Sequence, residues 1–166
     1  MKLAVWRVIL IGGFGVLSLP VNAHVSFVRR QVPQADTIDV TLRVPHGCKG
    51  SPTLRVRMRL PSVVQTVAPR APAGWSLKTS GEGSAREIVW SGRLSDRQTG
   101  EFAFAFSLAP TAKSGDLLFF PVVQECEVGV ERWIDVGGKP SADAPAGEAH
   151  DDATSPAPSI RLLPSK

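Results

Sequence analysis

Three segments of this chain alternate apolar and polar residues with a period of two, and this pattern constrains the fold more than any other feature. The segments are residues 37–44, 53–60 and 101–108. In the last of them, Phe102, Phe104 and Phe106 occupy alternate positions. Successive side chains of a strand point to opposite faces, so each segment is predicted to be a strand with one buried face.

The segment 53–60 also carries Arg55, Arg57 and Arg59 between its apolar residues. We expect these arginines to face water and to protect the strand against pairing with other chains. The alternative is a site in which the three guanidinium groups hold an anion.

Weaker apolar segments fill the intervals, and turns rich in glycine and proline separate them. These segments are residues 25–32, 63–67, 75–78, 87–90, 117–124 and 130–136. No segment shows sustained helical periodicity. The fold class predicted is all-β, an antiparallel immunoglobulin- or fibronectin-like β-sandwich with one disulfide.

The chain has two cysteines, Cys48 and Cys126. An oxidising compartment favours a disulfide between them, which would close a long loop and contribute about 4 kcal/mol in the chain-entropy account. A thiolate metal site is the alternative, and the absence of a Cys-x-x-Cys spacing disfavours it.

Residues 1–23 have the composition of a secretory signal peptide. Lys2 and Arg7 precede an apolar stretch, and a small residue, Ala23, stands where cleavage would occur. The apolar stretch is too short to remain in a membrane, so we expect an exported chain without a membrane anchor, either periplasmic or extracellular.

Cleavage after Ala23 would leave His24 as the first residue of the mature chain. Its free α-amine and its imidazole Nδ1 could then close a chelate ring on one metal ion, and Cu(II) favours nitrogen ligands of this kind. An α-amine loses its proton close to neutral pH, so a metal ion can displace it. An incidental N-terminal histidine is the alternative.

The sequence divides into four parts. A signal peptide (1–23) precedes a β-sandwich domain (24–136). A segment rich in alanine, proline and aspartate (137–158) is expected to be flexible, and residues 159–166 are expected to contain a last edge strand. His150 and the two aspartates after it could bind a cation weakly, but a solvated tail is the simpler interpretation.

Charge and motifs exclude several functional classes. The formal net charge is +4 for the whole chain, and about +2 without residues 1–23, which is too mild to indicate nucleic-acid binding. The sequence contains neither a Gly-x-Ser-x-Gly nucleophile elbow nor a phosphate-binding loop. We therefore expect a binding protein rather than an enzyme.

The order and spacing of several motifs across nearly the whole mature chain resemble the YcnI-like family of exported bacterial copper-binding domains. These motifs are His24, Val44-Pro-His-Gly-Cys48, Gly50-Ser-Pro-Thr53, Pro72-Ala-Gly-Trp75, Trp90, Phe120-Pro-Val-Val-Gln124, Cys126, Trp133-Ile134 and Pro156-Ala-Pro158. The resemblance implies a small β-sandwich that binds Cu2+ through the amine and imidazole of a single N-terminal histidine.

The resemblance implies that His24 is the copper ligand and that Trp133 lies close to the ion. An indole face attracts cations and would exclude water from one side of the metal, although Trp133 could equally be an ordinary core residue. Glu127, near the second cysteine and Trp133, is our preferred additional ligand. His46 could supply a second imidazole, but its Pro-His-Gly-Cys setting favours a role in a tight turn.

The predicted function is that of a monomeric copper chaperone or buffer that exchanges the ion with a copper transporter or an oxidase-assembly protein. A copper oxygenase is one alternative, although such enzymes complete the site with a second histidine. A metal-free interaction module, in which His24 is incidental, is the other.

Overall fold

The computed structural model describes residues 24–81, 86–137 and 155–165, and in these ranges the chain forms strands, turns and no helix. The predicted signal peptide (1–23) and most of the segment 137–158 lie outside them. The strands are β1 (Ser26–Phe27), β2 (Gln31–Pro33), β3 (Ile38–Val44), β4 (Thr53–Arg59), β5 (Val64–Pro69), β6 (Ser76–Ser80), β7 (Glu87–Leu94), β8 (Gly100–Leu108), β9 (Leu117–Phe119), β10 (Val122–Cys126), β11 (Val130–Asp135), β12 (Ser155–Pro156) and β13 (Ser159–Leu163).

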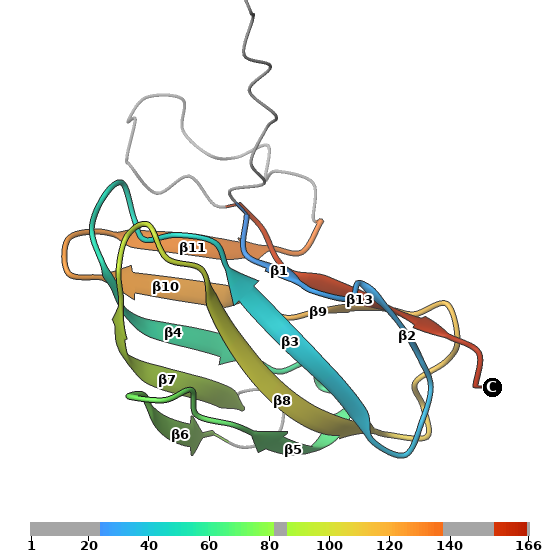
Figure 1. Ribbon diagram of the computed structural model, residues 1–166. Helices are drawn as coiled ribbons and strands as arrows, with labels where there is room; N and C mark the ends of the chain where they lie inside the picture. Colours follow the sequence, from blue (N-terminus) through green and yellow to red (C-terminus); the bar gives the residue numbers. More distant parts are fainter. Residues whose placement is uncertain (1–23, 82–85, 138–154, 166) are drawn as a thin grey trace, which may run out of the picture.

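Two main sheets pack face to face, and a smaller sheet closes one end of the sandwich (Figure 1). The first main sheet has the strand order β1-β3-β8-β5, and the second has the order β12-β11-β10-β4-β7-β6. The closing sheet has the order β2-β13-β9. Most neighbouring strands are antiparallel, so the predicted all-β sandwich is confirmed.

The core between the sheets consists largely of aromatic side chains on the inward faces of the alternating strands. Phe102, Phe104 and Phe106 of β8 are at most 1% exposed, and Trp90 of β7 is fully buried. Phe120 joins them, with its ring centroid 5.0 Å from that of Phe27. The period-two pattern therefore predicts the buried face correctly, because a strand in a β-sandwich has one side facing solvent and one side facing the core.

Two segments predicted as single strands are each split between sheets. Residues 25–32 form β1 in the first main sheet and β2 in the closing sheet. Residues 117–124 form β9 in the closing sheet and β10 in the six-stranded sheet, with Phe120 and Pro121 between them. Apolar periodicity does not reveal such a change, since both halves bury their side chains in the same core.

The arginine-bearing strand β4 differs from expectation in two ways. A register irregularity between Thr53 and Arg55 turns Thr53 inward and leaves Leu54 36% exposed. The strand also lies between β10 and β7, in the interior of its sheet. The arginines do face outward, but they cannot protect an edge, because both edges of β4 are already paired.

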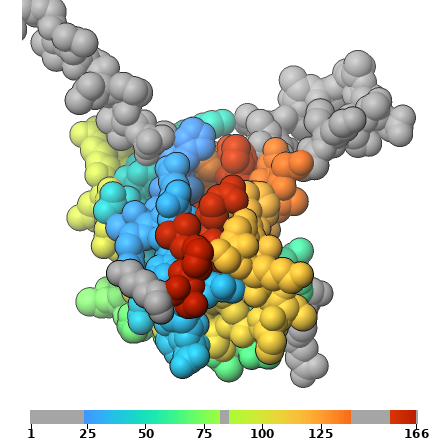
Figure 2. Space-filling model, turned by 90° about the vertical axis from the view of Figure 1, so that its right-hand side faces the viewer, coloured from blue at the N-terminus to red at the C-terminus, as the bar shows by residue number. Residues whose placement is uncertain are grey.

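The C-terminal strand was expected at a sheet edge and is instead the middle strand of the closing sheet. β13 pairs in parallel with β2 and antiparallel with β9. Figure 2 shows it (red) between the N-terminal segment (blue) and the yellow segment that contains β9. Ile160 and Leu162 are fully buried, so β13 completes the hydrophobic core of the same domain.

The predicted disulfide between Cys48 and Cys126 is present. Cys48 follows β3 of the first main sheet, and Cys126 ends β10 of the second, so the bond joins the two layers. Cys48 and Ser51 exchange backbone hydrogen bonds around Lys49 and Gly50, which both have positive φ. This two-residue turn brings the chain directly from Cys48 into β4.

Candidate metal centre

His24 is an exposed residue held in place by buried neighbours. The next residues, Val25 and Phe27, are each 3% exposed and anchor the start of the domain in the core. β1 pairs with β3, with Ser26 opposite Arg43. The imidazole is therefore presented at the surface on a short, firmly anchored segment.

Trp133 is the aromatic partner of His24 in the structure. The two ring centroids lie 5.3 Å apart, and the rings meet edge to face at 66°. Trp133 belongs to β11 of the six-stranded sheet, whereas His24 precedes β1 of the first sheet. Residues more than a hundred positions apart thus meet where the two layers approach each other.

The Trp133 side chain is only 7% exposed, yet its indole Nε1–H has no hydrogen-bond acceptor among the described residues. A buried donor without an acceptor costs about 1–3 kcal/mol. Trp90 has the more usual arrangement, since its Nε1–H donates to the Arg70 carbonyl at 3.0 Å. The unpartnered indole beside His24 is therefore costly for stability, which is typical of a functional position.

A cleft of about 280 Å³ opens beside His24. Its lining combines the N-terminal segment with the segment that enters β13: His24, Val25, Ser26, Phe27, Arg30, Pro156, Ala157, Pro158 and Ser159. None of these residues carries a carboxylate. Sequence reasoning did not place Arg30 or residues 156–159 at the site, and only the Pro156-Ala-Pro158 motif hinted at them.

Glu127, the preferred additional ligand, is not brought to this cleft. It lies in the turn between β10 and β11, where its carboxylate accepts a hydrogen bond from Arg93 at 3.0 Å. Trp133 lies opposite Val122, at the far end of this hairpin. At about 3.3 Å per residue, the two positions are separated by most of the length of β11, which argues against a shared metal ion.

His46 occupies the turn that the sequence favoured for it. Its Nδ1 lies 2.6 Å from the Gly47 carbonyl, and its own carbonyl accepts a hydrogen bond from Gln124 Nε2 at 2.7 Å. Gln124 is 2% exposed and also donates to Thr53 Oγ1 at 2.8 Å. This buried amide fixes the His46 turn next to the disulfide.

Within the described ranges, no three side chains of His, Cys, Asp or Glu cluster closely enough to hold a metal ion. A site at His24 would therefore depend on that residue's own nitrogens, with water or an external ligand in the remaining positions. An imidazole together with a free amine suits Cu(II), whereas Ca2+ or Mg2+ would require oxygen ligands. The indole beside the imidazole, whose N–H has no acceptor among the described residues, is compatible with a metal ion bound there.

A family model described as a domain of unknown function (DUF1775) matches residues 24–162 of this chain. The match begins at His24 and ends within β13, in agreement with the extent of the folded domain. No curated protein sequence matches the chain closely enough to count as a relative.

Among solved structures, the chain is similar to an uncharacterised protein from Nocardia farcinica with an immunoglobulin-like fold. That structure has 21% identity and a TM-score of 0.59, and the match covers 85% of this chain and 99% of the other. The sixth cohesin of scaffoldin B from Acetivibrio cellulolyticus, in complex with a dockerin mutant, has 10% identity and a TM-score of 0.49, covering 83% and 96%. The similarity to the Nocardia farcinica protein shows the fold alone.

Proposed function

This chain belongs to the DUF1775 family, the domain of the YcnI-like proteins, and we propose that it is an exported Cu(II)-binding protein whose ligand is the N-terminal His24. The observation that carries the proposal is the position of the His24 imidazole, 5.3 Å from the Trp133 ring and beside an open cleft. The start of the family match at His24 also supports it.

His24 would bind the ion through two nitrogens once the preceding residues are removed. Cleavage after Ala23 converts an amide nitrogen, which is a poor donor, into an amine that can release its proton to solvent when the metal binds. The buried side chains of Val25 and Phe27 hold the first residues against the core. This anchoring lowers the entropic cost of ordering an N-terminal ligand.

Trp133 would shield one side of the site. The indole is 7% exposed and packs against the imidazole edge to face, so water cannot enter between the two rings. Its electron-rich face would also favour a nearby cation.

The proposed role is a chaperone or buffer that acts by ligand exchange and performs no turnover. The cleft leaves the remaining metal positions accessible, and none of the described residues that line it is acidic. An accepting protein could therefore approach the ion and replace its water ligands one at a time. A copper transporter or an oxidase-assembly protein is the expected partner class, and the domain would act as a monomer in the periplasm or outside the cell.

The decisive experiment compares a protein that begins at His24 with one that carries Gly-Ser before it. Calorimetric titration with Cu(II) and electron paramagnetic resonance should show one tightly bound ion with nitrogen ligands for the first protein. Binding to the second should be far weaker, because both the amine and the chelate ring are lost.

Two controls separate this site from other histidines and carboxylates. His24→Ala with a native start should abolish tight binding, whereas His46→Ala and Glu127→Gln should retain it, because neither residue lies at the cleft. Equal Cu(II) affinity with and without the Gly-Ser extension would refute the proposal. Copper-dependent oxidation of glycans in the presence of peroxide would favour an oxygenase instead.

A further inference from the structure

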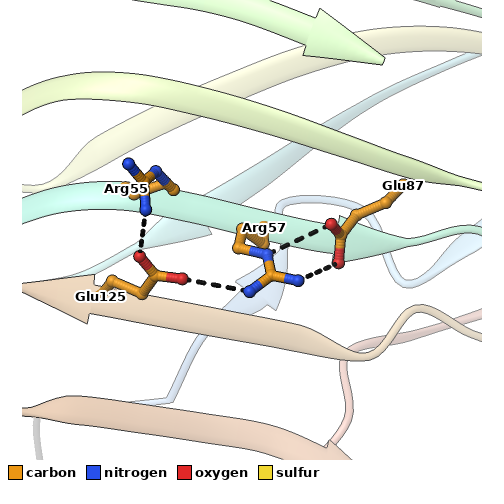
Figure 3. A network of polar contacts seen from close by, with 4 residues as sticks. All are labelled: Arg55, Arg57, Glu87 and Glu125. Carbon is orange, nitrogen blue, oxygen red and sulfur yellow. Dashed lines mark hydrogen bonds and ion pairs between the residues drawn. The ribbon is translucent and has the colours of Figure 1, made fainter. Parts of the chain in front are cut away.

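The outer face of the six-stranded sheet carries an ordered network of charges around Arg57. Its guanidinium donates two hydrogen bonds to Glu87, each at 3.2 Å, and one to Glu125 at 3.3 Å (Figure 3). Arg55 pairs with the other oxygen of Glu125 at 2.6 Å. These hydrogen bonds, first to Glu87 and then to Glu125, raise the pKa of Arg57, so it remains charged.

A groove of about 510 Å³ lies along this network, towards β11. Its apolar lining consists of Pro121, Val123, Ile134 and Val136, and the last of these is 49% exposed. A solvent-facing sheet normally presents polar side chains at such positions. The groove therefore offers an apolar strip on an otherwise charged face.

The charges that line the groove do not balance. Arg55 and Arg57 are paired with Glu125 and Glu87, whereas the positive charge of Arg59 is not matched by a carboxylate among the described residues. Glu87 is already engaged by Arg57 through both oxygens. The exposed side chain of Arg59 makes no ion pair within the described ranges, so it is available to a carboxylate from outside.

Arg59 has no evident role within the fold itself, whereas Arg57 joins β4 to Glu87 of β7 and to Glu125 of β10. β4 is an interior strand, so its positive charges do not protect a sheet edge. An excess of positive charge beside an apolar strip is instead typical of a surface that recognises a partner.

We propose that this groove binds an extended acidic segment of a partner protein. A carboxylate of that segment would pair with Arg59, and its alternate apolar side chains would lie on Val123, Ile134 and Val136. An acidic segment is favoured over a second copy of this chain, because a second copy would bring arginines against arginines.

The groove and the candidate metal centre lie on opposite faces of the same strand. Trp133 points inward towards His24, whereas its neighbours Arg132 and Ile134 line the groove. A partner docked in the groove would thus sit directly behind the strand that carries Trp133. Binding in the groove does not require copper, but its use in metal exchange rests on the proposed function.

The test uses the purified protein without added metal. The probes are fluorescent peptides of about ten residues in which glutamate alternates with valine or leucine, and matched peptides with lysine in place of glutamate. Fluorescence anisotropy should show binding of the acidic peptides only, and the affinity should fall as salt is added. Amide chemical shifts should change around Val123 and Ile134.

Arg59→Glu should weaken peptide binding by about tenfold or more, and Val136→Ser by a smaller factor. The control is Arg97→Glu, which makes the same change in charge at a side chain that is 94% exposed and lies outside the groove. Absence of binding at millimolar concentration, or equal losses for Arg59→Glu and Arg97→Glu, would overturn the proposal. So would Arg59-dependent binding only to vesicles of phosphatidylcholine and phosphatidylglycerol, which would assign the face to a membrane surface.

Discussion

The two buried tryptophans of the sandwich should respond very differently to substitution by phenylalanine. Trp133 is 7% exposed and Trp90 is fully buried, so the loss of the larger ring system costs each site about 1–2 kcal/mol in burial and packing. Burial alone therefore predicts similar destabilisation for Trp133→Phe and Trp90→Phe.

Hydrogen bonding separates the two substitutions. Trp133→Phe removes a donor that has no acceptor among the described residues. This removal stabilises the folded state by about 1–3 kcal/mol and largely cancels the free energy lost with the buried surface. In Trp90→Phe the hydrogen bond to the Arg70 carbonyl is lost as well. We expect Trp133→Phe to change the free energy of unfolding by no more than about 1 kcal/mol, and Trp90→Phe to lower it by about 2–4 kcal/mol.

Urea unfolding followed by circular dichroism measures both free energies without depending on tryptophan fluorescence. A second measurement links the result to the metal centre. Added Cu(II) should quench the fluorescence of the Trp90→Phe protein strongly, because Trp133 remains beside His24, and should quench the Trp133→Phe protein much less. Equal destabilisation by the two substitutions, with unchanged quenching, would show that Trp133 is an ordinary core residue.

Three further predictions concern the disulfide, a buried amide and pH. Replacing both Cys48 and Cys126 by alanine should lower the free energy of unfolding by about 4 kcal/mol, because the bond closes a loop between residues 78 positions apart. Chemical denaturation measures this loss, and a loss below about 1 kcal/mol would contradict the prediction. Gln124→Leu should lower the free energy of unfolding by about 2–3 kcal/mol, because the carbonyl of His46 and the hydroxyl of Thr53 would lose their buried donor. An unchanged free energy of unfolding in the same assay would contradict this. Cu(II) affinity, measured by competition with a chelator, should fall as pH decreases, because protons compete for both proposed nitrogen ligands, and a pH-independent affinity would exclude them.

The sequence alone predicted the layers of this fold. Alternation in residues 101–108 places the three phenylalanines of β8 in the core, where they are found. It also predicted the disulfide, because two cysteines behind a predicted export signal have few other uses. These predictions succeed because the side-chain period of a strand and the chemistry of thiols are local properties.

Local pattern could not predict how strands are assigned to sheets. Residues 117–124 form one continuous apolar segment, yet they contribute to two sheets. β13 was expected at an edge and is central, because its neighbours β2 and β9 are brought to it only when the sandwich closes. Pairing between distant strands depends on the complete topology, which no short window contains.

The candidate metal centre shows the same division. The sequence by itself singled out His24, since the predicted cleavage site and the chemistry of an N-terminal histidine are both local features, and the family resemblance suggested Trp133. Only the tertiary structure decided that these two rings meet and that Glu127 lies elsewhere, paired with Arg93. The physical reason is that the packing of the two sheets determines which residues meet across the layers. Glu127 is close to Trp133 in the sequence, but the β10–β11 hairpin places the two residues at opposite ends.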